Sequence, residues 1–389
     1  MEYSKHSFCA LPFVHQEKFF NHRHNICCYG QQSQSDTDDQ NSLDSFNSNK
    51  IKQIRTQMLE GQRPSECTFC WNIEDSGGSS PRTRETSPWL NLDSYRDAME
   101  RNIHDSVDGK TITPVSYDLR YSNTCTLKCR MCNSGSSSAI NAEYKKINTW
   151  PRKFWTEPNP RINHEIELTY DIQKIYLAGG EPLVEPYNLE MLIKLADVNP
   201  DVALIINTSL NHLSDKFLTV LNKFNNLTFA ISLDGVGQLN DYIRNGSEFA
   251  TVIDNIERIR HHQIMFSTCV SIYNVFDVPD IIRFVLTHYP EAEKNHWINN
   301  VNDLEELYVE NTPPELRSDI IKELRAVLPV TRENSTTGVE NLIIALEQDN
   351  FNPKRFENFK KYTTILDQSR GEDIRLMQPK LAKYFKKVL

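Results

Sequence analysis

The 389-residue chain lacks the features that would place it in a membrane or on a nucleic acid. It has no run of about 18 apolar residues, which argues against a membrane-spanning helix. Its first thirty residues lack the layout of a secretory signal peptide. It has no long basic block and a formal net charge of -9, which argues against broad electrostatic attraction to nucleic acid. We therefore expect a cytoplasmic protein with neither a membrane nor a nucleic acid as its partner.

Cysteine is present in a number and arrangement that point to metal binding. The chain has nine cysteines, an odd number, and disulfides are rare in a reducing compartment. Eight of the nine fall in two groups: Cys9, Cys27, Cys28, Cys67 and Cys70, then Cys125, Cys129 and Cys132. Such short spacings favour metal ligation over disulfide formation.

Strand and helix patterns alternate through the middle of the chain. Six segments have the pattern of β-strands: 115–121, 172–177, 202–207, 227–233, 264–272 and 296–301. Between them lie segments with helical spacing of apolar residues: 136–146, 189–196, 214–222, 249–260 and 278–287. This alternation predicts a parallel βα array. Because a closed barrel needs eight units, we expect an α/β fold with a partial (βα)6 barrel.

Two regions of different character flank the array. The N-terminal region is expected to be irregular, with loops at 31–50 and 72–84 and a short helix at 51–59. The C-terminal region has no convincing strand and predicts helices at 315–328, 338–348 and 356–366. We expect three parts: 1–112, which carries the first cysteine group, the barrel at 113–302, and a helical region at 303–389.

The second cysteine group has the chemistry of an incomplete cluster site. Thiolates are the usual ligands of iron–sulfur clusters, and a cubane cluster takes one ligand per iron. Cys125-x3-Cys129-x2-Cys132 supplies only three, so one iron stays open for a cofactor or substrate with chelating groups. The alternatives are a zinc site, or three cysteines that merely share a helix face.

The segment 117–132, YDLRYSNTCTLKCRMC, resembles the signature of the radical S-adenosylmethionine (radical SAM) superfamily. The resemblance implies a 4Fe-4S cluster bound to S-adenosyl-L-methionine. It also implies reductive cleavage of that cofactor to a 5′-deoxyadenosyl radical, which abstracts hydrogen from a substrate. Met131 stands where the family often has an aromatic residue, and its apolar side chain can still contact adenine.

A second motif, IYLAGGEP at 175–182, follows one βα unit later. Glycines let a ligand approach the backbone closely. By itself the motif is better read as a strand-to-helix turn. In its place after the cysteine triplet it resembles the family's contact to the methionine amino group. The resemblance implies cofactor binding by four residues: Gly179, Gly180, Glu181 and Pro182.

A third motif, ISLDGVGQLNDYIR at 231–244, is similar to the family's fourth-strand motif. The resemblance implies that Ser232 and Arg244 contact the carboxylate and ribose of the cofactor. Taken alone, Asp234-Gly235 reads as a turn and Arg244 as a surface ion pair. The third strand ends in Asn207-Thr208-Ser209, where relatives often have Thr-Asn-Gly, so the implied ribose contact at Thr208 departs from the family pattern.

The first cysteine group resembles the auxiliary segment called a twitch or SPASM-like domain. The resemblance is carried by FCALPF at Cys9, the Cys27-Cys28 pair, and CTFCWNIEDSGGSSPR from Cys67. It implies one auxiliary 4Fe-4S cluster with four of the five cysteines as ligands and either Cys27 or Cys28 left over. In better-known relatives this segment follows the barrel, whereas here it precedes it. A structural zinc site, with His22 and His24 as possible further ligands, is the alternative.

Cys269 belongs to neither group. A buried, inert thiol is its usual reading, since free cysteine is often part of a core. Alternation along the strand 264–272 places it on the same face as Ser271, and our minority hypothesis is a catalytic residue that faces the barrel interior.

These patterns together predict an enzyme that modifies an unreactive C–H position by a radical route. Because SPASM-bearing relatives often modify ribosomally made peptides, we expect a peptide or protein side chain as substrate and a reductant such as flavodoxin or ferredoxin as partner. The alternatives are radical oxidation or rearrangement of a small metabolite such as a sugar or nucleotide, and a non-catalytic iron–sulfur or zinc protein.

Overall fold

The computed structural model describes residues 3–19, 24–28, 42–147 and 166–386. The chain forms two compact units. Unit 1 consists of residues 1–123, 157–206 and 215–227, and unit 2 of residues 124–156, 207–214 and 228–389.

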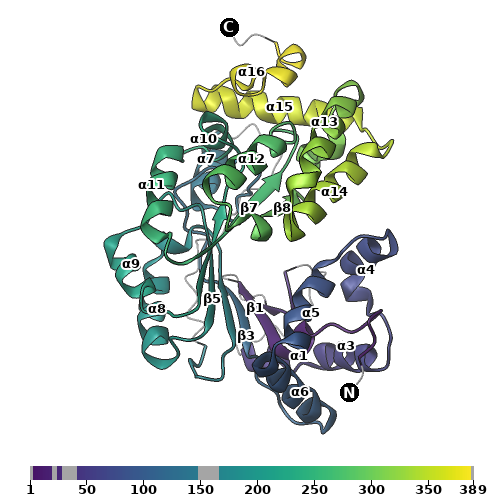
Figure 1. The fold of residues 1–389 in the computed structure, drawn as a ribbon, viewed down its shortest axis with the longest axis vertical. Helices are drawn as coiled ribbons and strands as arrows, with labels where there is room; N and C mark the ends of the chain where they lie inside the picture. Colours follow the sequence, from purple (N-terminus) through teal and green to yellow (C-terminus); the bar gives the residue numbers. More distant parts are fainter. Residues whose placement is uncertain (1–2, 20–23, 29–41, 148–165, 387–389) are drawn as a thin grey trace. The chain divides into compact units, whose positions relative to one another are not determined.

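Unit 1 contains the first strands of the sheet: β1 (His15–Phe19), β2 (His24–Asn25), β3 (Ser116–Arg120), β4 (Lys174–Leu177) and most of β5 (Ala203–Thr208) (Figure 1). They lie in the order β2-β1-β3-β4-β5. β2 is antiparallel to β1, and the neighbours from β1 to β5 are parallel. Its helices are α1 (Leu11–Val14), α2 (Ser42–Phe46), α3 (Asn49–Leu59), α4 (Thr68–Asp75), α5 (Pro81–Asn91), α6 (Asp93–Val107), α8 (Pro186–Val198) and α9 (Asp215–Leu221).

Unit 2 contains the parallel strands β6 (Leu227–Ser232), β7 (Gln263–Val270) and β8 (Trp297–Asn300), in that order. Its helices are α7 (Ser138–Ile147), α10 (Gln238–Ile243), α11 (Phe249–Ile259), α12 (Val278–His288), α13 (Pro314–Val327), α14 (Glu333–Glu347), α15 (Pro353–Arg370) and α16 (Ile374–Met377). The predicted α/β partial-barrel fold is confirmed, and all six predicted strands are present. The helical C-terminal region is confirmed as well.

The sheet has one parallel strand more than the sequence predicted. β1 has the sequence HQEKF, and its three central residues Gln16, Glu17 and Lys18 are at most 2% exposed. A strand built from buried polar residues has no alternation of apolar and polar side chains, so a hydrophobic pattern does not reveal it.

Two predicted loops are partly helical. Residues 42–50 contain α2 and the start of α3, and residues 72–84 contain the end of α4 and the start of α5. The serines that suggested loops cap helices instead. The side chain of Ser48 accepts a hydrogen bond from the Ile51 amide, and that of Ser80 accepts one from Thr83. Serine is common in loops and at helix N-caps for the same reason: its hydroxyl binds free backbone groups.

Each unit has its own apolar core. In unit 1, Phe8, Phe13 and Trp89 belong to a cluster between α1, α5 and α6. In unit 2, residues of the β7–β8 region and of α13 to α15 form one continuous cluster. Among the described residues, no helix is long and apolar enough to cross a membrane.

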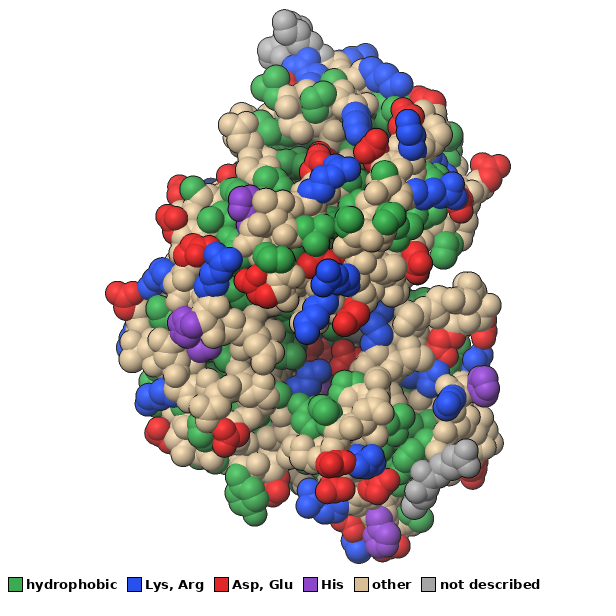
Figure 2. Space-filling model, in the orientation of Figure 1, with side chains coloured by type: hydrophobic (Ala, Val, Ile, Leu, Met, Phe, Trp, Pro, Cys, Tyr) green, Lys and Arg blue, Asp and Glu red, His purple; other side chains and the backbone are tan. Residues whose placement is uncertain are grey.

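Charged side chains of both signs are interspersed on the face shown in Figure 2. Some ion pairs of the described residues lie one helical turn apart, such as Arg260–Glu257 at 3.2 Å and Arg283–Asp280 at 2.7 Å. Exposed pairs of this kind contribute little to stability, because water and salt screen them.

Asp277, the N-cap residue of α12, gives a pH-dependent contribution to stability. Burial raises the pKa of this carboxyl to about 6, although it accepts a hydrogen bond from Gln378 Nε2 at 2.5 Å. A folded-state pKa above the unfolded value means that the contribution is fully present below about pH 4 and is lost as the pH rises through 6. We expect Asp277→Asn to remove this dependence. The difference in unfolding free energy between the variant and the wild type should grow in favour of the variant by about 2 kcal/mol from pH 4 to pH 7. Urea unfolding at several pH values measures it, and a constant difference would contradict the prediction.

Candidate functional site

The second cysteine group lies on the loop that follows β3, here called the cluster loop (Cys125–Cys132). All three of its cysteines are thiols outside any disulfide and are partly exposed. Backbone hydrogen bonds hold the loop in place: the amides of Lys128 and Arg130 donate to the carbonyls of Asn245 and Ile243, both at 2.8 Å. The loop is therefore ordered by the end of α10 and the residues that follow it.

The three thiols of the cluster loop lie near one another. The pKa of Cys132 is raised by burial first and then by the neighbouring thiols of Cys129 and Cys125. Within the described residues, the three cysteines do not form a group whose ligand atoms all lie within 4.8 Å of one another. Thiolates around one tetrahedral zinc ion, at about 2.3 Å from the metal, lie only about 4 Å apart. In a polynuclear cluster each thiolate binds a different iron, so the three sulfur atoms need not converge on one metal atom.

Arg244 is directed at the cluster loop by a buried carboxylate. Its Nε lies 2.6 Å from Asp234 Oδ2, and its Nη1 lies 3.9 Å from Cys129 Sγ. Asp234 is fully buried and also accepts a hydrogen bond from the Cys269 amide at 2.7 Å. Desolvation by burial acts to lower the pKa of Arg244, but the Asp234 carboxylate and the Cys129 and Cys269 sulfurs together raise it above its usual value, so the guanidinium stays charged. Sequence reasoning missed Asp234, since it read Asp234-Gly235 as a turn.

Cys269, on β7, lies near Asp234, Arg244 and the cluster loop. Its thiol interacts electrostatically with Asp234, Arg244 and Cys129. Burial, followed by the Asp234 charge, raises its pKa to about 12. The group is therefore a protonated thiol at neutral pH. Both Cys269 and Met131 pack against the core of unit 2.

Ser232 and Thr208 stand at the ends of neighbouring strand segments. Ser232 Oγ donates to Asn207 Oδ1 at 3.4 Å. Thr208 Oγ1 accepts a hydrogen bond from the Leu210 amide at 2.8 Å, and its side chain is nearly buried. Ser232 thus remains partly accessible, while Thr208 is used to close a turn.

The second motif lies in unit 1, where Gly179 makes a close backbone contact with the end of the β3 segment. Gly179 has φ +122°, and a Cβ atom there would lie 2.7 Å from the Ser122 carbonyl oxygen. The next amide, of Gly180, donates to the same oxygen at 3.1 Å. Glu181 Oε1 accepts from the Leu183 amide at 3.3 Å, which caps the short helix that begins at Pro182.

We expect Gly179→Ala to destabilise unit 1 strongly. A side chain there is strained by the positive φ, which alone costs about 1–3 kcal/mol, and it also collides with backbone. Gly109→Ala is a matched control, because Gly109 has φ +75° and a methyl group at its Cβ position would have no neighbour within 4 Å. Denaturant unfolding should show a larger loss of free energy for Gly179→Ala than for Gly109→Ala. Equal losses would show that the contact with Ser122 has no effect.

Asn123 lies between Ser122 and the cluster loop and is fully buried. Among the described residues, neither its Oδ1 nor its Nδ2 has a hydrogen-bond partner. Buried amides are almost always paired, so Asn123 is an exception within the described part of the chain. Within unit 2, three thiols on one loop and a guanidinium directed at them are a residue set that fits an iron–sulfur cluster with cysteine ligands.

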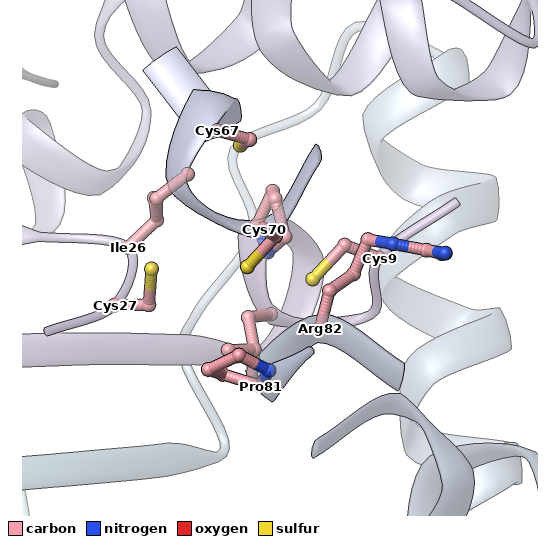
Figure 3. A pocket seen from close by; sticks show the side chains of 9 residues that line it. Cys9, Ile26, Cys27, Cys67, Cys70, Pro81 and Arg82 are labelled. Carbon is pink, nitrogen blue, oxygen red and sulfur yellow. The ribbon is translucent and has the colours of Figure 1, made fainter. Parts of the chain in front are cut away.

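The first cysteine group forms a separate site in unit 1. Four sulfur atoms, those of Cys9, Cys27, Cys67 and Cys70, face a common space (Figure 3). The cavity has a volume of ≈ 410 Å³, counted with its open mouth. It is completed by apolar residues and one cation: Leu11, Pro12, Ile26, Pro81 and Arg82. Four thiols around one space are the number of ligands that a complete cluster needs.

The electrostatics of this site agree with its geometry. The pKa of Cys67 is raised by burial and then by the thiols of Cys9, Cys27 and Cys70. Burial raises the pKa of Cys9 to about 11, while the Arg82 guanidinium acts to lower it. A bound metal would convert these thiols to thiolates.

Cys28 does not line this cavity. Its sulfur and the carboxylates of Glu17 and Asp118 all lie within 4.8 Å of one another. Arg120 Nη2 lies 2.8 Å from Asp118 and 3.3 Å from Glu17, so a cation already accompanies the two carboxylates. The structure therefore places Cys27, and not Cys28, with the other three thiols. His22 and the side chain of His24, the alternative zinc ligands, lie outside the described residues.

One part of the chain matches a known protein family. Residues 119–285 match the family model of the Radical SAM superfamily. This part of the chain is therefore similar to a radical SAM domain.

A comparison with curated proteins finds no match. Among solved structures, SuiB from Streptococcus suis aligns over 90% of this chain and 72% of its own chain, with 13% identity and a TM-score of 0.40. The same protein bound to its precursor peptide SuiA aligns over 88% of this chain and 75% of its own, with 11% identity and a TM-score of 0.38. The protein anSMEcpe with bound AdoMet aligns over 56% of this chain and 60% of its own, with 14% identity and a TM-score of 0.38.

Proposed function

We propose that this protein is a radical SAM enzyme that abstracts hydrogen from an unreactive C–H position of its substrate. The observation that carries the proposal is the cluster loop: three neighbouring thiols on one loop, within a segment that matches the radical SAM family model. When bound, the 4Fe-4S cluster with S-adenosyl-L-methionine supplies a 5′-deoxyadenosyl radical. The protein supplies binding, orientation and electrostatics.

Each side chain of the proposed site has a physical task. Cys125, Cys129 and Cys132 hold three irons as thiolates and leave one open. Arg244, held by Asp234, places a positive charge beside Cys129, which favours the thiolate form. Thr208 and Ser232, both in unit 2, are proposed to contact the cofactor.

The backbone at Gly179 and Gly180, with Glu181 and Pro182, would hold the amino-acid end of the cofactor. The support for this role is the resemblance of the motif at 175–182 to the family's contact to the methionine amino group. Met131 is proposed to contact adenine. The protonated thiol of Cys269 remains a candidate catalytic group near the cluster loop.

Cys9, Cys27, Cys67 and Cys70 are proposed to hold an auxiliary 4Fe-4S cluster. With four protein ligands, such a cluster has no open iron, which suits electron transfer and not substrate ligation. A flavodoxin or ferredoxin would supply the electrons. In this division of labour, 1–112 carries the auxiliary cluster, 113–302 the radical chemistry, and 303–389 the support of the barrel.

For the substrate we propose a peptide or protein side chain. The support is the resemblance of the first cysteine group to the SPASM-like segment, an associational argument. A sugar, nucleotide or other small metabolite is the second candidate class.

Anaerobic reconstitution with iron and sulfide, followed by reduction with excess S-adenosyl-L-methionine, tests the proposal. We expect 5′-deoxyadenosine and methionine to form in equal amounts. Their repeated absence from protein that contains the expected iron would overturn the enzyme function in favour of a non-catalytic iron–sulfur protein.

A further inference from the structure

The C-terminal region makes a buried ionic contact with the cluster loop. Arg130, between Cys129 and Cys132, is 0% exposed. Its Nη2 lies 2.6 Å from Asp367 Oδ1 on α15 and 2.5 Å from Glu372 Oε2, just after that helix.

The remaining contacts of Arg130 fix it further. Its Nε donates to the Tyr242 carbonyl at 2.9 Å, and its guanidinium lies over the Tyr242 ring, 3.6 Å from the centroid. Tyr362 of α15 donates its hydroxyl to the Arg130 carbonyl at 2.7 Å. Both the side chain and the backbone of this residue between two cluster cysteines are therefore fixed by α15 and α10.

The two carboxylates are themselves held in place. Asp367 Oδ1 accepts from the Tyr242 hydroxyl at 2.9 Å, and its Oδ2 accepts from the Ile374 amide at 2.8 Å. Glu372 Oε1 accepts from Asn245 Nδ2 at 2.7 Å. α15 ends with Gly371 in the left-handed conformation at φ +69°, which turns the chain so that Glu372 follows directly.

We propose that Asp367 and Glu372 are positioning residues, which hold Arg130 and thereby fix Cys129 and Cys132 before the cluster binds. The meaning of this role for catalysis rests on the proposed function. A buried ion pair is a poor source of net stability, since apolar side chains of the same volume do as well. The presence of this ion pair inside the cluster loop is better explained by the single loop geometry that it enforces.

The test compares Asp367→Asn and Glu372→Gln with Thr363→Val, all in the full-length chain. Thr363 lies one turn before Asp367 on α15, is fully buried, and shares a 2.7 Å hydrogen bond with the Tyr273 hydroxyl. Its substitution therefore removes a buried hydrogen bond of the same helix but neither ion pair of Arg130, and it leaves the Tyr273 ring in place, whose centroid lies 5.5 Å from the Arg130 guanidinium.

Amide hydrogen exchange of the segment 125–132 is measured in cluster-free protein, together with the midpoint of urea unfolding. We expect Asp367→Asn to speed exchange of this segment roughly tenfold or more, and Thr363→Val to leave it unchanged. In reconstituted Asp367→Asn protein, the reduced cluster on the cluster loop should also give an altered electron paramagnetic resonance signal. Glu372→Gln, a change at a more exposed group, should give the smaller effect in the same direction.

Unchanged exchange in both carboxylate variants, or the same acceleration in Thr363→Val, would overturn the proposal. If Asp367→Asn does not fold, Glu372→Gln against Thr363→Val decides it. The exchange experiment needs neither cluster nor cofactor. A protein that never forms 5′-deoxyadenosine but shows the exchange response would refute the proposed function and leave the positioning role intact.

Discussion

Cys129→Ala is expected to lower 5′-deoxyadenosine formation by at least roughly 10³-fold, because the cluster loop supplies only three ligands and none is spare. Cys129 also lies 3.9 Å from Nη1 of Arg244, so the variant loses the charge contact as well as the ligand. The measurement is chromatographic quantification of 5′-deoxyadenosine from anaerobically reduced protein with S-adenosyl-L-methionine.

Iron and sulfide counts of the same variant separate the two cysteine sites. About four irons per chain should remain, since the four thiols of the first site are untouched. Cys28→Ala is the matched control and should keep full 5′-deoxyadenosine formation and about eight irons. Activity of Cys129→Ala close to that of the control would contradict the assignment of the cluster loop.

Cys27→Ala and Cys28→Ala are expected to differ sharply although the residues are adjacent. Cys27 lines the cavity with three other thiols, whereas Cys28 lies with the carboxylates of Glu17 and Asp118. Loss of one ligand from a closed four-thiol site should reduce the iron count from about eight to about four, while the count for Cys28→Ala stays at about eight.

Metal analysis of the two variants reports the nature of the site as well as its ligands. If the cavity holds zinc, Cys27→Ala should lose about one zinc and no iron or sulfide. If Cys28→Ala loses the metal and Cys27→Ala retains it, our placement of the ligand is wrong. Spectra of the cluster loop in Cys27→Ala serve as an internal control, because that cluster should be unaffected.

The parts of this protein that could be predicted from sequence are those in which chemistry or periodicity is local. The cysteine triplet lies within one short loop, and its incomplete ligand set already predicts an open iron. The six predicted strands follow from apolar side chains that repeat every second residue, such as Ile175 and Leu177 in β4. The order of the three motifs along the chain needs no tertiary information.

The strand β1 could not be predicted from the sequence because its buried residues are polar. Gln16, Glu17 and Lys18 are tolerated inside because charged and polar partners from other segments surround some of them, as Arg120 and Asn25 do for Glu17. A hydrophobic pattern reports burial only where burial is apolar.

The sequence by itself predicts the radical chemistry, because the proposed ligands and glycines lie within short motifs. Only the tertiary structure decided which of Cys27 and Cys28 faces the other thiols, since a vicinal pair points its side chains in different directions. Only it joined Arg130 to Asp367, 237 residues away, and Arg244 to Asp234 and Cys129. Ion pairs and cavity walls depend on distances in space, and a linear pattern contains no information about those distances until the chain has folded.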